Sequence, residues 1–265
     1  MRRALHAEWT KLVTVPAHLW TLAAVTAVLA AAGVLVAATQ RPPDCGPGGG
    51  CAPQDITALV LSGVYLAQLA ALAVAVALVS GEYQPRVILL TLAARPGRGT
   101  VLLAKAAVAT AAVLVSAVLG VAAALAAGHE VLSARGFTAR AGRGPVPLSD
   151  PALLRAAAGT VLYLVLVGVL ALGAAWVLRH QAAAVGAVAG LLYGPFVASR
   201  IVPMPVHVLH AVQDASPMSA GLAAQSLVPG TGTAPIGPWS GLAVLAAWAA
   251  AALSAGWLML ERRDG

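Results

Sequence analysis

Long apolar runs without a charged side chain alternate with short polar segments along this chain. Each run is rich in Ala, Leu and Val, and none shows the alternation of apolar and polar residues that marks a membrane β-strand. A bilayer core of about 30 Å needs about 20 helical residues, and the backbone inside it must be hydrogen-bonded within its own segment. The pattern therefore predicts an all-α bundle of six transmembrane helices in a single domain, residues 1–265: Leu19–Thr39, Ile56–Ser80, Ala106–Gly128, Ala156–Leu178, Gln181–Ser199 and Trp239–Leu260.

The composition indicates a membrane protein and excludes a soluble catalytic domain. Of 265 residues, 60% are hydrophobic and 9% are charged, and the mean hydropathy is +0.88. A soluble domain carries roughly a quarter charged residues. The polar segments between the apolar runs are too short to fold into a separate enzyme domain. We therefore expect no covalent chemistry from this chain.

The basic residues indicate the orientation, because cytoplasmic loops of membrane proteins are enriched in Lys and Arg. With the N-terminus in the cytoplasm, ten basic residues lie inside and six outside, three of the latter between Gly128 and Asp150. We expect both termini to be cytoplasmic and the net charge of +7 to favour anionic lipid. There is no basic polar domain that would bind nucleic acid. A cleaved signal peptide is the alternative for the first run, which is longer than a usual signal core.

Both cysteines lie in one short loop, Cys45-Gly-Pro-Gly-Gly-Gly-Cys51, on the expected outer side. The glycines let the chain fold back so that the two sulfurs can meet, and disulfides persist outside the cytoplasm. We predict a disulfide between Cys45 and Cys51. A metal or redox pair is one alternative, although the spacing is not the two-residue spacing of such motifs and no histidine is near. Two free thiols are the other.

Motifs that would give the chain its own energy source or cofactor are missing. Neither Lys11 nor Lys105 follows the glycine pattern of a phosphate-binding loop, so we expect no ATP site. The predicted spans contain no Asp, and Glu82 lies just past the second, which disfavours an ion-coupled transporter. His207 and His210 are close together but lack carboxylate or cysteine partners, so we predict no metal site. No cofactor is expected to bind this chain.

Residues 1–16 have the pattern of an amphipathic helix. Apolar side chains recur at helical spacing on one face, and charged side chains lie away from it. The apolar set is Leu5, Trp9, Leu12 and Val13, and the charged set is Arg2, Arg3, Glu8 and Lys11. We predict a helix at the membrane interface that ends at Pro16, with Trp9 at headgroup depth. A disordered basic tail that only sets the topology is the alternative.

The connection of residues 81–105, between the second and third spans, is the longest on the expected cytoplasmic side. An apolar octet inside it, residues 87–94, is too short to cross a membrane and too apolar to remain in water. We predict a short helix at the membrane surface, with charged ends that a cytoplasmic partner can push. A plain loop with a positive cluster is the alternative. The residues assigned to this connection are Glu82, Tyr83, Arg86, Arg95, Arg98 and Lys105.

Two stretches resemble the membrane subunits of bacterial type-2 ATP-binding-cassette exporters, small permeases with six spans. One is the opening Glu8-Trp9-Thr-Lys11-Leu run, and the other runs from Gly-Glu82-Tyr83 through Arg95-Pro-x-Arg98 to Ala-Lys105. The resemblance implies that Glu8, Trp9 and Lys11 belong to a connecting helix at the cytoplasmic surface. It implies that the residues of the 81–105 connection belong to a coupling helix that docks in the ATPase. Family members commonly follow the Glu-Tyr pair with Gly-Thr, where this chain has Gln84-Pro85-Arg86.

The resemblance further implies a permease subunit of the bacterial plasma membrane that is not itself an enzyme. It would form the substrate path of an exporter and be driven by a separate cytoplasmic subunit that binds ATP and Mg²⁺. Alternatives are a secondary transporter, or a membrane partner protein that transports nothing and has no ATPase.

A stripe of glycines in the fifth span indicates close helix packing. Gly186, Gly190 and Gly194 lie four residues apart, which lets another helix approach closely. That helix belongs either to the same chain or to a second permease copy, identical or a paralogue. The family works in pairs, with the first and fifth spans near the central seam, which favours the second copy. Pro195 is expected to end the regular helix.

Residues 201–238, ahead of the sixth span, are rich in proline and poor in charge. The segment is too long for a turn, and its apolar residues predict a partly embedded outer cap with short re-entrant helices. Exporters of the family that the chain resembles often have such an element here. A flexible external loop is the alternative.

Overall fold

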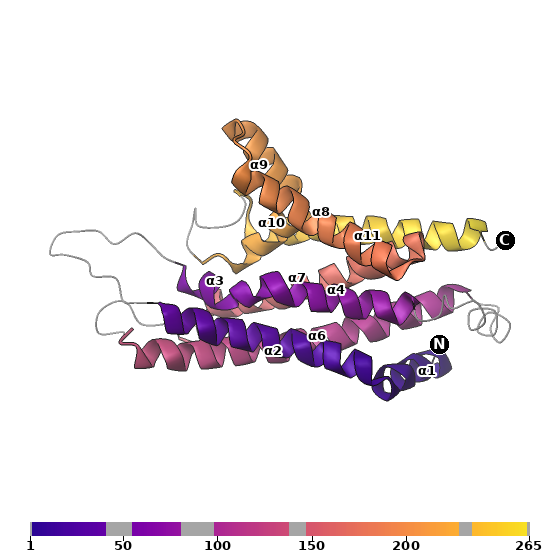
Figure 1. Ribbon diagram of the computed structural model, residues 1–265, viewed down its shortest axis with the longest axis horizontal. Coiled ribbons are helices and arrows are strands. Elements are labelled where there is room, and N and C mark those ends of the chain that lie inside the picture. Colours follow the sequence, from indigo (N-terminus) through magenta and orange to yellow (C-terminus); the bar gives the residue numbers. More distant parts are fainter. Residues whose placement is uncertain (1, 41–54, 81–97, 138–146, 228–234, 264–265) are drawn as a thin grey trace.

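The computed structural model describes residues 2–40, 55–80, 98–137, 147–227 and 235–263 (Figure 1). Within these ranges every regular element is a helix, and six stretches are long and apolar enough to cross a membrane. The predicted all-α bundle of six spans is therefore confirmed, and the chain is a multi-pass membrane protein. The elements are α1 (Arg2–Thr14), α2 (Pro16–Thr39), α3 (Ile56–Val60), η1 (Leu61–Gly63), α4 (Val64–Ser80), α6 (Arg98–Ala134), α7 (Pro151–Leu178), α8 (Gln181–Ile201), α9 (Val206–Ala215), α10 (Pro217–Leu222), η3 (Ala223–Gln225) and α11 (Pro238–Arg263).

The helices begin where the sequence supplies start signals. Pro16 and Pro151 occupy the first turns of α2 and α7, where a missing N–H costs nothing. Asp150 caps α7 by accepting a hydrogen bond of 2.7 Å from the Ala152 N–H, and Asp55 caps α3 in the same way. Such caps satisfy backbone donors that have no partner inside the helix.

Three features differ from the sequence-based expectation. The helix α6 begins at Arg98 rather than near Ala106, so Lys105 lies inside a helix and not in a loop. Pro195 does not end α8, which continues to Ile201. A membrane helix tolerates proline because neighbouring groups can satisfy the one carbonyl that it frees. The second span narrows to a 3₁₀ turn at η1, where Gly63 lies directly against α2.

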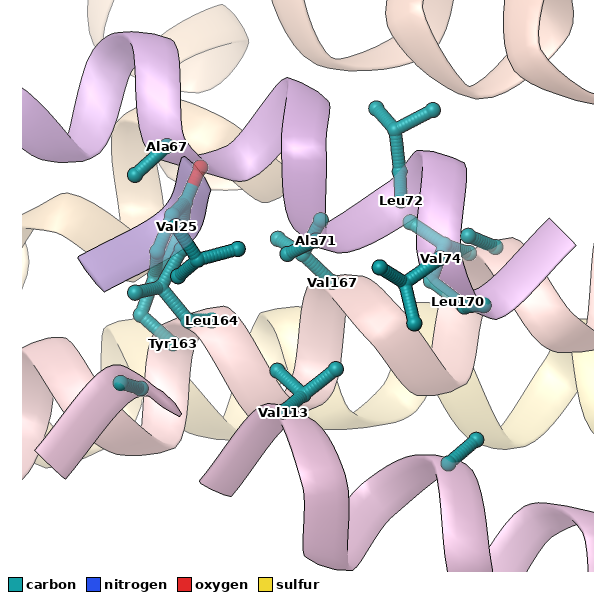
Figure 2. Close-up of a cluster of buried hydrophobic side chains, with 14 of the residues drawn as sticks. Val25, Ala67, Ala71, Leu72, Val74, Val113, Tyr163, Leu164, Val167 and Leu170 are labelled. Carbon is teal, nitrogen blue, oxygen red and sulfur yellow. The ribbon is translucent and has the colours of Figure 1, made fainter. Parts of the chain in front are cut away.

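The helix α7 lies at the centre of the bundle and packs against α4, α6, α8 and α11, while α2 packs against α4 and α6. Figure 2 shows this core, in which Tyr163, Leu164, Val167 and Leu170 of α7 meet side chains of the neighbouring helices. The neighbours drawn there are Ala67, Ala71, Leu72 and Val74 of α4, Val25 of α2 and Val113 of α6. The spans α2, α8 and α11 are the least buried.

The helix α1 and the C-terminal end of α11 lie at the same end of the bundle (Figure 1), which we call the terminal end. The helices α3, α9 and α10 lie toward the opposite end, the distal end. At the terminal end only Arg179 and His180 separate α7 from α8. Arg179 has a left-handed φ of 53° and its N–H closes α7 on the Ala175 carbonyl, and His180 Nδ1 accepts from the Ala183 N–H at 3.3 Å.

Glycines set the closest helix contacts, because packing rather than the hydrophobic effect holds helices together in lipid. One such contact joins α7 to α11 at Gly173. A Cβ atom added there would lie 2.5 Å from the Ala252 carbonyl carbon and 2.6 Å from the Leu253 nitrogen, both backbone atoms. Gly168, on the same helix, differs: its added Cβ would meet Val113 at an ordinary 3.6 Å.

These two glycines give a matched test of the packing. Gly173→Ala should destabilise the protein by about 1–3 kcal/mol, because α11 must move away. Gly168→Ala should change stability by less than about 1 kcal/mol, because the methyl group fits and alanine favours helix. Thermal unfolding of the two variants in detergent measures both effects. Equal stability of the two variants would contradict the described α7–α11 contact.

Candidate functional site at the terminal end

The helix α1 packs along α6 with one narrow face. This face differs from the apolar face that the sequence predicts. Leu5 is half-buried and Leu12 is buried, and Glu8 lies between them and is buried as well. Trp9 and Val13 point away and are 52% and 45% exposed. The sequence analysis placed Glu8 away from the apolar face and grouped Leu5 and Leu12 with Trp9. That assignment was wrong, because Glu8 has a charged partner inside the bundle.

The partner of Glu8 is Lys105, which the sequence analysis assigned to the connection between the second and third spans. Lys105 Nζ lies 2.8 Å from Glu8 Oε2, and the side chains are only 2% and 7% exposed. The same ammonium group donates a hydrogen bond of 2.9 Å to the main-chain carbonyl of Leu78. Lys105 therefore joins three elements: α1, the end of α4 and the start of α6. We call these three groups the Lys105 clamp.

The position of the Leu78 carbonyl explains why a lysine fits there. Leu78 is in the last turn of α4, where helix carbonyls lack a partner within the helix. The C-terminal end of a helix also carries partial negative charge, which favours a cation. The Glu8 carboxylate neutralises the ammonium group directly. A buried charge is costly unless it is paired and hydrogen-bonded, and Lys105 is both.

The clamp lies next to both ends of the segment between α4 and α6, because α4 ends at Ser80 and α6 begins at Arg98. We call the residues between these helices, 81–97, the candidate coupling segment. Of the predicted site residues, the structure brings together Glu8 and Lys105. Trp9 and Lys11 lie on α1, and Arg98 is the first residue of α6. The remaining predicted residues of the connection lie outside the described residues, as do the two cysteines: Glu82, Tyr83, Arg86, Arg95, Cys45 and Cys51.

The glycine stripe of α8 faces away from the bundle. Gly186, Gly190 and Gly194 are exposed, and a Cβ added to any of them would meet nothing within 4 Å in the described part of the chain. The opposite side of α8 packs inward through Val188 and Leu192. Among the residues that the structure describes, therefore, no helix of the same chain fills the stripe.

His207 and His210 lie on α9, and both are exposed. In the described ranges, no three His, Cys, Asp or Glu side chains come close enough to hold a metal ion.

Several polar groups inside the bundle were not anticipated from the sequence, and two of them bind other elements of the bundle. One is the Leu78 carbonyl, which as a main-chain group gives no sequence signal. The other is Gln68, whose amide is fully buried beside Tyr163. Gln68 is the one carboxamide inside the second predicted span, and a lone amide among apolar residues was a signal that could have been used.

No protein-family model matches the sequence, and no curated protein matches it either. What the site can do is therefore argued from its own chemistry. The clamp joins α1, α4 and α6 through one buried ion pair and one hydrogen bond, near the end of α4 and the start of α6.

Removing one charged partner of the clamp should destabilise the protein more than removing both. Glu8→Gln or Lys105→Met each leaves one buried charge without its partner, at a cost of about 3–5 kcal/mol. The double variant Glu8→Leu with Lys105→Met should lose less than either, because no charge stays buried. Thermal unfolding in detergent measures the three losses.

His6→Gln is the matched control, since His6 is an exposed polar residue on the same helix. A single clamp variant as stable as this control would contradict a buried, paired Glu8.

Proposed function

We propose that the chain is the permease subunit of an ATP-binding-cassette exporter, which forms the substrate path and is driven by a separate cytoplasmic ATPase. The observation that carries the proposal is the Lys105 clamp. Glu8 and Lys105 come from the two stretches that resemble this family, and they meet in one buried ion pair. Force can be transmitted through the connection between spans two and three only if its ends are joined to other helices. The clamp makes such a joint with the N-terminal helix.

The clamp gives the proposal a mechanical route. Two ATPase subunits that close on ATP and Mg²⁺ would push the segment between α4 and α6 from the cytoplasm. Because Lys105 ties both ends of that segment to α1, the push would move α1, α4 and α6 as one unit. The packing of α4 and α6 on α7 would carry this motion into the core. The orientation follows, with the terminal end and both termini in the cytoplasm.

A second permease copy belongs to the proposal, with α8 at the seam. The open face of α8 carries the stripe of three glycines, which suits close contact with another membrane helix. The peripheral position of α8 leaves that face accessible from the membrane.

The ATPase partner is tested by gentle purification of the tagged protein from its native membrane, followed by mass spectrometry. An ATP-binding-cassette subunit should co-purify with the wild type and be depleted with Glu82→Ala. Glu130→Ala is the control, because Glu130 is an exposed glutamate at the distal end of α6, on the expected outer side. Recovery of no ATPase, even after crosslinking, would overturn the proposal and favour an ion-gradient transporter. Equal depletion by both variants would overturn the coupling role of Glu82.

The second copy is tested by cysteine crosslinking in a Cys45→Ser, Cys51→Ser background. Gly190→Cys should form a covalent dimer under mild oxidation in membranes, because a Cβ added there meets nothing within 4 Å among the described residues of its own chain. Leu119→Cys should not crosslink, although Leu119 is 57% exposed on α6. A dimer yield no higher for Gly190→Cys than for Leu119→Cys would place the seam elsewhere.

A further inference from the structure

Asp214 is a carboxylate that neither the Lys105 clamp nor the proposed α8 seam uses. It lies in the last turn of α9, and none of the six spans contains it. Its side chain is partly buried, and its Oδ1 atom is fully buried without a hydrogen-bond partner among the described residues. Such an atom requires an explanation, because a buried polar atom without a partner costs free energy.

A contact with α11 gives the depth of Asp214 in the bundle. Trp248 Nε1 donates a hydrogen bond of 3.0 Å to the carbonyl of Ala215, the residue after Asp214. Trp248 is near the middle of the sixth span. It lies about 15 Å along α11 from Pro238, which is about half the thickness of a bilayer core. The end of α9 therefore reaches the middle of the membrane.

A contact with α4 gives the same depth. Met218, four residues after Asp214, accepts a weak hydrogen bond of 3.5 Å at its Sδ from Gln68 Nε2. Gln68 is halfway along the second span. Ionisable side chains at this depth are rare in membrane proteins and usually serve a function. The sequence gave no sign of this one, because Asp214 lies between two spans.

The other carboxylates whose side chains the structure describes are in a different situation. Glu8 belongs to the Lys105 clamp, and Asp55 and Asp150 each accept hydrogen bonds from main-chain N–H groups. Glu130 is exposed. Within the described ranges, Asp214 is the carboxylate that has a buried oxygen without a partner. A ligand with a positive charge would supply the missing partner.

The surroundings of Asp214 favour an organic cation over a metal ion. A divalent metal ion takes several ligands from side chains, and no three His, Cys, Asp or Glu side chains come together in the part of the chain that the structure describes. An organic ammonium group can instead bind one carboxylate and the face of an aromatic ring. The indole of Trp248 is held at the level of Asp214 and is 40% exposed.

Polar side chains lead along α9 from the distal end to Asp214. His207, His210 and Asp214 are three and four residues apart, so they lie on one side of the helix. Both histidines are exposed. The other exposed residues of α9 are apolar: Val206, Val208, Ala211 and Ala215. A molecule with one charged group and an apolar body matches both sides of this helix.

We propose that Asp214 binds the positively charged group of the transported substrate, which is therefore an amphipathic organic cation. The proposal rests on the transport function proposed above and names its substrate class. The positive charge pairs with the carboxylate of Asp214 at the middle of the membrane. The apolar part of the substrate lies against the indole of Trp248.

The test is saturable binding of tetraphenylphosphonium, a lipophilic cation, to purified protein in nanodiscs without ATPase. Empty nanodiscs give the background that comes from lipid. Asp214→Asn removes the charge and keeps the shape, so it should weaken binding about tenfold or more, as expected when one partner of a desolvated charge pair is removed. Asp214→Glu keeps the charge and should bind the probe more tightly than Asp214→Asn.

Two controls isolate the charge of Asp214. Glu130→Gln removes one negative charge from an exposed position at the distal end of α6 and should leave the affinity unchanged. Tetraphenylborate is an anion of the same shape as the probe, and Asp214→Asn should not weaken its binding.

The wild-type protein gives a second measurement that does not depend on how a variant folds. Dicyclohexylcarbodiimide modifies carboxyl groups in apolar surroundings, and mass spectrometry of the peptides locates the adduct. Bound tetraphenylphosphonium should slow modification of Asp214 and leave that of Glu130 unchanged.

Three results would overturn the proposal. One is the absence of saturable binding to the wild type together with no protection of Asp214. Another is equal affinity of the wild type and Asp214→Asn. The third is displacement of the probe by sodium or by potassium ions but not by both alike, which would assign Asp214 to an inorganic ion. None of these results bears on the ATPase partner, which is tested by co-purification. A missing ATPase would leave the binding result intact, so the two proposals fail separately.

Discussion

The absence of water from the bilayer core is the constraint on which this structure depends. Every polar group that enters the bundle must find its partner within the protein. At the terminal end, this requirement makes Lys105 bind a carboxylate from α1 and a carbonyl from α4 at the same time. Near the middle, it makes Gln68 and Tyr163 bind each other. The few polar side chains in the bundle thus decide which helices are tied together, while the many apolar ones provide only shape.

Glycine sets the closest contacts between these helices. Gly159 and Gly173 of α7 and Gly241 and Gly256 of α11 have backbone or side-chain atoms directly against them, so each fixes one close contact. The glycines of α8 have no such neighbour within the described chain. The same residue type therefore has two uses in this bundle. Inside, it sets the spacing of helices that are already packed, and on α8 it leaves a face on which a further helix can be packed.

The sequence was sufficient for the spans, since an uninterrupted apolar run of about 20 residues has few other stable structures in a membrane protein. It was not sufficient for the start of α6. Lys105 interrupts the charge-free run, whereas a charge with a buried partner can continue a helix. The partner could not be found from periodicity, because Glu8 and Lys105 are 97 residues apart in the chain. Pro195 was misjudged for a related reason, since the rule that ends soluble helices at proline is weaker in membranes.

The two-residue connection between α7 and α8 has a consequence for any seam built on α8. Arg179 and His180 cap both helices in a tight turn, so at the terminal end α8 cannot separate from α7. Farther along, the Tyr193 hydroxyl binds the Tyr65 carbonyl, and the Phe196 ring packs on the Tyr65 ring, 5.6 Å away. These contacts are weaker than a covalent turn. If two copies of α8 faced each other, each would be fixed to its own α7 at the terminal end. The two helices could then separate more easily at the distal end. In the dimer proposed above, an opening between them would be widest at the distal end.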